Sequence, residues 1–402
     1  MHVTRKIIPL FLFVLLLGVV IAYARGYRLD AQKGKVTSTG IIAVSSDPAT
    51  AQVYVNGVLK GVTDMHLTLP FGKYTVEVRK EGYTSWKRNF VLKGELVVTA
   101  DATLFPLNTS LTPLTSIGIS SVVTIDKTDK ALLFVQNGDT EKDGIYLFDQ
   151  TKRPFSLFPP LKILAYKRQF PEGVDMGSAD VTFSPDYKEG VFTFKNGEDT
   201  ISYLLSVEDE NKQLFEVTSS KDSLFSAWDA ERQKEAAKLL EIFPAGFVKI
   251  ASDSFKISSL SPDKTKILYE AKQSIDLPLI INPPLVSADQ TPEERSIKAG
   301  QLYVYDRKED RNYEVKLPAP VEESRKKGKN VVIWFPSSKH LVVHEENQIS
   351  IMEYDGTNKQ IIYSGPHDGS YFDVTSDEKL LILANLNPQL NKAPDLYAVG
   401  IR

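Results

Sequence analysis

Hydrophobic residues follow two different patterns along the chain. Residues 7–23 read IIPLFLFVLLLGVVIAY, an apolar run without a charged residue. From residue 40 onward, short β-branched and aromatic runs alternate with polar positions at a period of two, and clusters of Gly, Pro, Asn and Asp separate these runs. The pattern predicts an all-β protein that begins with one apolar helix.

The apolar run predicts a transmembrane anchor over residues 7–24, after an N-terminal tail of residues 1–6. A cleaved signal peptide is the alternative, because the sequence Ala22-Tyr23-Ala24 fits a small-residue cleavage site. The positive-inside rule taken alone favours a cytoplasmic C-terminal part, but long domains cross membranes largely regardless of charge. We therefore expect a single-pass cell-membrane protein whose C-terminal domains are extracytoplasmic.

A linker over residues 25–39 is expected to lead into a small β module over residues 40–106. Val53 and Val55 alternate with polar neighbours, and Asn56-Gly57 adopts the positive φ angles of a two-residue hairpin at low cost. Roughly six short strands in about 65 residues predict a small β-sandwich.

This module resembles the PEGA domain, a β-sandwich of bacterial envelope proteins. The resemblance implies a non-catalytic module that acts as a spacer or as a contact to the cell wall. The family's Pro-Glu-Gly-Ala run is Pro48-Ala49-Thr50-Ala51 here, so only its ends match. The residues that carry the resemblance are Ser46-Asp47-Pro48, AQVYVNG (51–57), Gly61-Val62-Thr63, Phe71-Gly72-Lys73-Tyr74 and Lys80-Glu81-Gly82-Tyr83.

Residues 107–402 contain five segments with one shared layout: a strand, a tight polar turn and an apolar strand. A third strand follows each segment, and a fourth short strand follows four of them. Four strands per unit is the blade of a β-propeller, so about five blades are predicted. The five segments are 123–136, 181–194, 258–271, 332–345 and 372–385, and the four short strands are 155–158, 213–217, 312–317 and 359–365.

The blades resemble the TolB-type and WD-repeat-like propellers of bacterial envelope proteins. Phe183-Ser184-Pro185-Asp186 and Leu260-Ser261-Pro262-Asp263 carry this resemblance, together with Tyr305-Asp306 and Tyr354-Asp355 at the ends of third strands. With the anchor and the first module, the whole chain resembles PEGA-domain-containing bacterial membrane proteins.

The last repeat lacks a fourth strand, because the sequence ends with the third strand at residues 395–402. An uncovered strand edge favours aggregation. Residues 104–114 contain Pro106 and Pro113, which a sheet tolerates at its edge. We therefore predict that part of 104–114 pairs with 395–402 and closes a five-bladed ring.

Two insertions interrupt the repeats. Residues 223–243 predict one helix, with a capping box from Ser226 to Asp229. Its apolar face is expected to pack on a blade edge, with partner binding as the alternative. Residues 274–300 are Pro-rich and predict an irregular loop or lid. The candidate interaction surface consists of Leu277, Leu279, Ile280 and Trp228.

Composition and motifs supply few candidates for chemistry. The chain has a net charge of −3, which argues against nucleic acid as a partner, and no cysteine, which excludes disulfides and thiolate chemistry. His340 and His344 are four positions apart in a strand, about 13 Å, too far to share one metal ion. Asp126 and Asp129 are expected to be solvated turn carboxylates, with Ca²⁺ contact as the alternative. No catalytic, metal-binding or cofactor-binding residue and no cofactor is predicted.

The sequence therefore favours a non-enzymatic, membrane-anchored envelope protein. Residues 7–23 would hold it at the membrane, and the propeller would bind an envelope protein or a cell-wall polymer. The alternative is an envelope hydrolase or lyase with its site in the central funnel of the propeller. Convergent acids with a histidine would mark that enzyme, whereas a plugged or apolar funnel would mark a scaffold.

Overall fold

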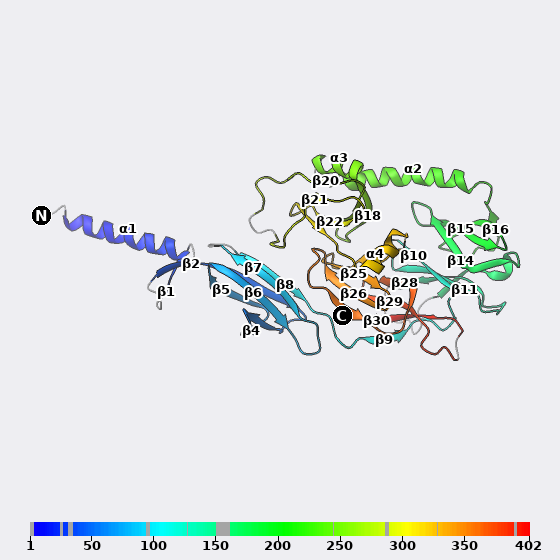
Figure 1. Cartoon of the computed structure of the whole chain (residues 1–402), viewed down its shortest axis with the longest axis horizontal. Coiled ribbons are helices and arrows are strands. Elements are labelled where there is room, and N and C mark those ends of the chain that lie inside the picture. The colour runs from blue at the N-terminus through cyan, green and yellow to red at the C-terminus, as the bar shows by residue number, and fades with distance from the viewer. Residues whose placement is uncertain are drawn as a thin grey trace. The chain divides into compact units, whose positions relative to one another are not determined.

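The structure divides into two compact units (Figure 1). The first contains Met1–Asn108 with Ile281–Glu293, and the second contains Thr109–Ile280 with Glu294–Arg402. This computed structural model describes residues 4–24, 27–30, 35–93, 97–126, 128–149, 161–243, 245–285, 289–327, 329–389 and 392–402.

The apolar N-terminal run forms the helix α1 (Thr4–Ala24). Its side chains from 11 to 21 are exposed, with Phe11 at 67% and Leu16 at 63%. Among the residues that the structure describes, no helix combines the length and the hydropathy needed to cross a bilayer. The helix is therefore confirmed, and its membrane-spanning role stays a prediction.

The remainder of the first unit is a sandwich of two four-stranded sheets. In one sheet β2 pairs with β1 and β5 in antiparallel fashion and with β8 in parallel. The apolar residues between the sheets, such as Ile42, Val53, Val76 and Trp86, form the core. The strands of the first sheet are β1 (Tyr27–Asp30), β2 (Lys35–Asp47), β5 (Met65–Pro70) and β8 (Val97–Thr103), and those of the second are β4 (Val58–Val62), β3 (Gln52–Val55), β6 (Gly72–Arg79) and β7 (Trp86–Leu92).

Two predictions about the first unit have different outcomes. The hairpin at Asn56-Gly57 is confirmed, with φ angles of 50° and 80°, and the Asn56 side-chain oxygen accepts a bond of 2.9 Å from the Thr75 amide. The linker over 25–39 is wrong in part, because Tyr27–Asp30 pairs with residues 35–38 in a hairpin. Nothing in the local pattern indicates this pairing, since the strands are short and follow the apolar helix directly.

A segment distant in sequence completes the edge of the first unit. The side chain of Gln290 forms two hydrogen bonds with the backbone of Val91 in the edge strand β7. Its Oε1 accepts from the Val91 amide at 2.7 Å, and its Nε2 donates to the Val91 carbonyl at 3.2 Å. Asp289 forms an ion pair of 3.1 Å with Arg88. Residues 281–293, predicted as part of a propeller loop, thus provide an edge strand with hydrogen-bond partners that it otherwise lacks.

The second unit contains five four-stranded antiparallel sheets, consistent with propeller blades. Each predicted repeat supplies the first two strands of one sheet. The predicted fourth strand at 155–158 lies outside the described residues, and β13 occupies the outer position of its sheet. In order, the sheets are β10 (Ser121–Ile125), β11 (Lys130–Val135), β12 (Gly144–Asp149) and β13 (Leu161–Tyr166); β14 (Val174–Phe183), β15 (Glu189–Asn196), β16 (Asp199–Ser206) and β17 (Phe215–Glu216); β18 (Phe255–Leu260), β19 (Lys266–Ala271), β22 (Leu302–Asp306) and β23 (Arg311–Glu314); β24 (Val332–Trp334), β25 (His340–Glu345), β26 (Gln348–Glu353) and β27 (Gln360–Tyr363); β28 (Asp368–Val374), β29 (Lys379–Ala384), β30 (Asp395–Gly400) and β9 (Ser110–Pro113).

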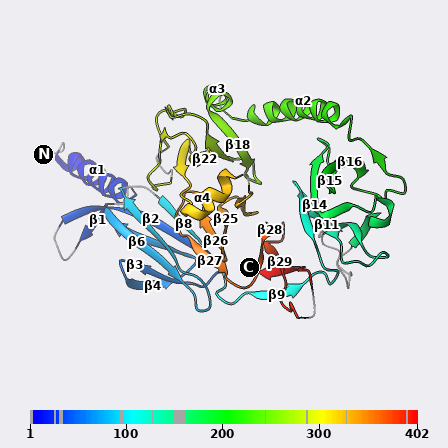
Figure 2. The ribbon, with the colours of Figure 1, turned by 45° about the vertical axis from the view of Figure 1, so that its right-hand side comes forward.

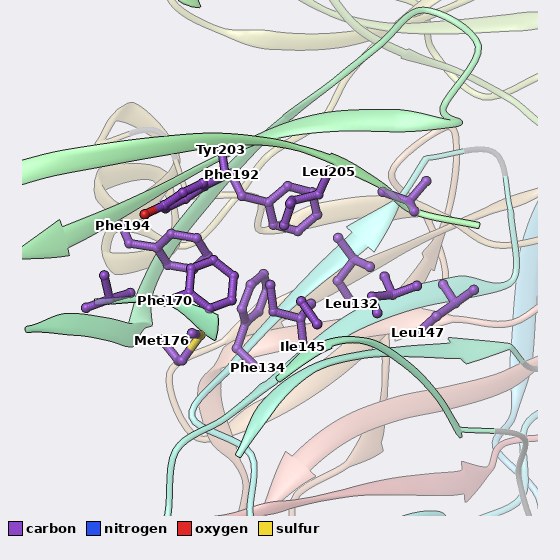
Figure 3. Packing of buried hydrophobic residues seen from close by; sticks show 14 of the residues in the cluster. Leu132, Phe134, Ile145, Leu147, Phe170, Met176, Phe192, Phe194, Tyr203 and Leu205 are labelled. Atoms are coloured by element: carbon purple, nitrogen blue, oxygen red, sulfur yellow. The ribbon is translucent and has the colours of Figure 1, made fainter. Parts of the chain in front are cut away.

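Apolar clusters join neighbouring sheets. Between the first and second sheets the rings of Phe134 and Phe192 lie 6.1 Å apart, and those of Phe170 and Phe194 lie 5.4 Å apart (Figure 3). Other clusters join the first sheet to the fifth and the third sheet to the fourth. The first and second, the third and fourth, and the fifth and first sheets therefore share apolar cores, as packed blades do.

The predicted closure of the last sheet is confirmed. Strand β9 pairs antiparallel with β30, from Pro113 opposite Tyr397 to Ser110 opposite Gly400. The buried carboxylate of Asp395 accepts bonds from the Thr115 hydroxyl (3.0 Å) and from the amides of Ile117 (2.8 Å) and Gly118 (3.1 Å). The segment that enters the unit is thereby fixed to its last strand.

The helical insertion differs in detail from the prediction. Helix α2 (Lys221–Leu240) begins before the predicted capping box, and the Ser226 hydroxyl bonds to the Asp222 carbonyl at 2.8 Å, as serines inside helices do. The guanidinium of Arg232 donates to the Phe183 carbonyl of β14 at 3.1 Å. A second helix, α3 (Ala245–Ser254), was not predicted, and both helices lie between the second and third sheets (Figure 2).

The remaining connections contain short elements. The helix α4 (Ala319–Lys326) precedes the fourth sheet, and its Arg325 forms ion pairs with Glu322 and Glu270. The other elements are η1 (Lys167–Gln169), β20 (Ile275–Asp276) and β21 (Ser296–Ile297).

Candidate functional site

The candidate site is a cavity of about 410 Å³ where the first turns of four sheets converge. These are the turns of the sequence repeat. Its lining comprises Thr124, Asp126, Thr128, Asp129, Lys130 and Ala131 of the first sheet, Pro262 of the third, Asn330, Ile333, Trp334 and Pro336 at the fourth, and Tyr371, Phe372, Asp373, Val374, Thr375 and Ser376 of the fifth.

All five first turns have the same backbone hydrogen bond, from residue i+3 to the carbonyl of residue i. The accepting carbonyls belong to Ile125, Ser184, Ser261, Phe335 and Thr375, and the bonds measure between 2.8 and 3.2 Å. The turns are therefore equivalent in backbone conformation, and those of the first, third, fourth and fifth sheets contribute residues to the cavity. The cavity is thus a consequence of the repeat.

Side chains of the repeated motif stiffen these turns. In the third sheet the hydroxyl of Ser261 donates to Asp263 at 2.6 Å, and the amide and hydroxyl of Thr265 donate to the same carboxylate. Burial opposes the ionisation of Asp263, but these bonds outweigh it and lower its pKa to about 2. This carboxylate stays charged near neutral pH and stabilises the turn.

The pKa of Asp373 is shifted in the opposite direction from that of Asp263. Burial raises the pKa of Asp373 to about 6, and the charges of Asp126 and Asp129 add to this effect. Bonds from the Val374 amide (2.8 Å) and the Thr124 hydroxyl (3.3 Å) oppose it only in part. Asp373 is therefore an acid that changes its charge within the physiological range, inside a cavity.

Asp129 connects the first and fifth sheets across the cavity. Its carboxylate accepts a bond of 3.0 Å from the Ser376 amide and a second bond from the Ser376 hydroxyl. The prediction of a simply solvated carboxylate is therefore wrong for Asp129, whereas Asp126 is exposed. Among the described residues, no group of three or more histidine, cysteine, aspartate or glutamate side chains has the arrangement of a metal site.

Aromatic residues also line the cavity. They include Trp334 together with Tyr371 and Phe372, which are 6% and 8% exposed. Burial raises the pKa of Tyr371 well above its usual range, and the charge of Asp373 adds to this, so its hydroxyl stays protonated. No histidine is found among the described residues that line the cavity. The arrangement can hold a positively charged or hydroxyl-bearing group between carboxylates and aromatic rings.

Comparison with known proteins identifies the family of the first β module. The PEGA domain family matches residues 39–108. Residues 39–108 are a PEGA domain. No curated protein matches the chain.

The solved structures show distant similarity to TolB-like β-propeller proteins. A candidate TolB from Agrobacterium tumefaciens is 11% identical, with 69% of this chain and 77% of that chain covered, at a TM-score of 0.24. TolB from Acinetobacter baumannii is also 11% identical, with 81% and 60% covered, at a TM-score of 0.22. An acylaminoacyl peptidase from Pyrococcus horikoshii is 12% identical, with 67% and 36% covered, at a TM-score of 0.18.

The residues predicted as an interaction surface lie outside both the PEGA domain and the cavity lining. Leu277 is only 7% exposed and packs in the cluster around Phe247, so its predicted exposure is wrong. Leu279 is 50% exposed, and Ile280 and Trp228 are half-buried. Leu277 is buried because the pairing of β20 with β21 turns its side chain toward the third sheet.

The predicted separation of His340 from His344 agrees with their contacts. His340 is 4% exposed and packs against the ring of Phe335, whereas His344 contacts His367. The sequence did not indicate that His367 meets His344, because the two lie 23 positions apart in different repeats.

Sequence reasoning also missed Asp373, although a signal was present. Counted from the shared turn bond, the equivalent residues of the other sheets are Val123, Thr182, Ser259 and Ile333. An acid at a position that the other repeats fill with apolar or hydroxyl residues is a departure from the repeat. Comparing the repeats position by position would have identified it.

Proposed function

We propose that this protein is a non-enzymatic binding scaffold of a bacterial cell envelope, and that the cavity formed by the first turns of the blades holds its ligand. The observation that carries the proposal is that Asp126, Asp129 and Asp373 line one cavity together with aromatic side chains. Loops that a rigid scaffold brings together are where binding residues are usually found.

The chemistry of the cavity selects the ligand class. Three carboxylates favour a positively charged group, and Trp334 with Phe372 favours flat or apolar surface beside that charge. A lysine or arginine side chain of an envelope protein, or an amino group of a cell-wall polymer, has both properties. The PEGA domain is proposed to act as the spacer between the membrane and this binding unit.

Membrane attachment through residues 7–23 is part of the same proposal. Its support is the row of exposed apolar side chains on α1, whose exposure in water would be unfavourable. The C-terminal domains are proposed to be extracytoplasmic, in line with the envelope proteins that the sequence resembles.

The binding proposal is tested with the full-length protein in mild detergent, mixed with purified cell-wall sacculi and, separately, with crosslinked envelopes. Asp126→Lys reverses a charge at an exposed cavity residue and should reduce the recovered ligand. Glu172→Lys makes the same charge change at an exposed position outside the cavity and serves as the control. If both variants recovered equal amounts of ligand, the cavity would not be the binding site.

An envelope hydrolase or lyase is the second candidate. The observation that favours it is Asp373, which has a pKa of about 6, above that of an ordinary carboxyl group. Two further acids, Asp126 and Asp129, line the same cavity. Pairs of acids with separated pKa values perform general acid–base catalysis in many enzymes. Release of soluble fragments from sacculi by the wild type, lost in Asp373→Asn, would establish this candidate over the scaffold.

A further inference from the structure

Two histidines from different parts of the sequence meet between the fourth and fifth sheets. His344 lies near the end of β25, and His367 lies in the connection that leads into β28. Their Nε2 atoms are 3.1 Å apart, and their ring planes are nearly perpendicular at 84°. Both side chains are half-buried, so solvent reaches the pair.

The separation of the two nitrogens is that of a metal chelate. Two nitrogens bound to one tetrahedral Zn²⁺ at about 2.0–2.1 Å lie roughly 3.3–3.4 Å apart. The observed 3.1 Å is close to this value, so a small movement of either ring would accommodate the ion. A hydrogen bond between two neutral imidazoles is equally compatible with 3.1 Å. The contacts around the two rings therefore distinguish a metal site from a simple hydrogen bond.

The first of these contacts is the hydrogen bond on the far side of His367. Its Nδ1 donates to the Gly365 carbonyl at 2.9 Å. This bond places the proton on Nδ1 and leaves the Nε2 lone pair directed at His344. A bond from the non-ligating nitrogen to a backbone carbonyl is the usual support of a metal-binding histidine.

The second is the packing of His344. Its ring stacks on Phe372 with centroids 5.2 Å apart, and a side chain added at Gly369 would approach its Cε1 at 3.3 Å. The ring is therefore held in one orientation.

We propose that His344 and His367 form a binding site for a borderline divalent transition metal, Zn²⁺ or Cu²⁺, with water as the remaining ligands. The ion would join the fourth and fifth sheets beside the proposed binding cavity, whose lining residue Phe372 stacks on His344. Imidazole nitrogen is a preferred ligand of both ions. Neither residue is needed for the proposed ligand binding, so the two proposals fail independently.

The test uses the full-length protein in mild detergent after treatment with EDTA. Calorimetric titration with Zn²⁺ should give one ion per chain. His344→Gln and His367→Gln should each weaken binding at least about 10-fold, since even the supporting partners of metal ligands contribute that much. His66→Gln is the matched control, because it removes an exposed histidine of the PEGA domain.

Electron paramagnetic resonance of the Cu²⁺-loaded protein provides a second signature. The wild type should show coupling to two imidazole nitrogens, and each pair variant should show one. Equal Zn²⁺ affinity of the wild type and His367→Gln, or no binding at equimolar concentration, would overturn the proposal.

A measurement on the wild type alone guards against variants that fail to fold. Diethyl pyrocarbonate modifies accessible neutral imidazoles, and mass spectrometry locates the modified residues. Zn²⁺ should slow modification of His344 and His367 and leave His66 unaffected. Unchanged rates at all three histidines would also reject the site.

Discussion

Replacing Asp373 by Asn should make the stability of the second unit less dependent on pH. The pKa of this carboxyl is about 6 in the folded protein, against an ordinary value of 3.8. The folded state therefore binds the proton more tightly than the unfolded state does. Below about pH 3 both states are protonated, and ionisation costs the folded protein nothing.

As the pH rises from about 4 to about 6, the unfolded chain loses its proton first, and the wild type becomes less stable because of this group. A difference of about 2 pKa units corresponds to an upper bound of about 3 kcal/mol, at 1.36 kcal/mol per unit. Asp373 keeps part of its surface exposed, so solvent screening reduces the expected effect to about 1–2 kcal/mol.

The assay is urea unfolding at pH 5 and pH 8 of a variant in which Trp86 and Trp228 are replaced by Phe, so that the fluorescence reports on Trp334 of the same cavity. Asp373→Asn keeps an oxygen that can accept from the Val374 amide. Relative to the wild type it should therefore be more stable at pH 8 than at pH 5. Because the unfolded chain is already mostly ionised at pH 5, only about half of the effect falls in this interval, about 0.5–1 kcal/mol.

Asp180→Asn is the control for that experiment, since Asp180 is an exposed acid on the innermost strand of the second sheet. It should shift stability equally at both pH values. If Asp373→Asn and Asp180→Asn gave the same pH dependence, the buried carboxyl would not be the group that titrates, and the electrostatic account of the cavity would be refuted.

Three further predictions concern closure and attachment. Asp395→Ala leaves the amides of Ile117 and Gly118 without their acceptor, and it should destabilise the second unit by about 2–4 kcal/mol in urea unfolding; a loss below 0.5 kcal/mol would contradict this. A chain starting at Ser116, which lacks β9, should melt several degrees below one starting at Ala102, as differential scanning calorimetry would show; equal melting would mean that β9 contributes nothing. The full-length protein should stay with membranes after carbonate washing, whereas a mature N-terminus at Arg25 would show that the anchor is removed.

The repeated architecture could be predicted because its signals are local. A polar turn between two apolar strands is written in about a dozen consecutive residues, and five such segments are consistent with a five-blade count. The pairing of β9 with β30 could be predicted because the last repeat has only three strands of its own, which leaves the edge of its third strand without a partner. Proline at 113 fits an outer strand, which is where β9 lies.

The features that were not predicted depend on contacts between distant residues. Gln290 and Val91 are 199 positions apart, and no pattern near either of them indicates that they pair. The His344–His367 contact likewise requires the placement of two sheets. The raised pKa of Asp373 could not be predicted either, because it results from burial and from the neighbouring acids Asp126 and Asp129.

The pairing of β9 with β30 imposes an order on biosynthesis. Residues 110–113 leave the ribosome or the translocation pore nearly 300 positions before their partner strand at 395–400. During that interval the fifth sheet does not exist, and the exposed surface of the first sheet that packs against it must be kept from other chains. Chaperones of the compartment in which the chain folds would therefore meet a second unit without its fifth sheet, and a chain interrupted before residue 395 would remain in that incomplete state.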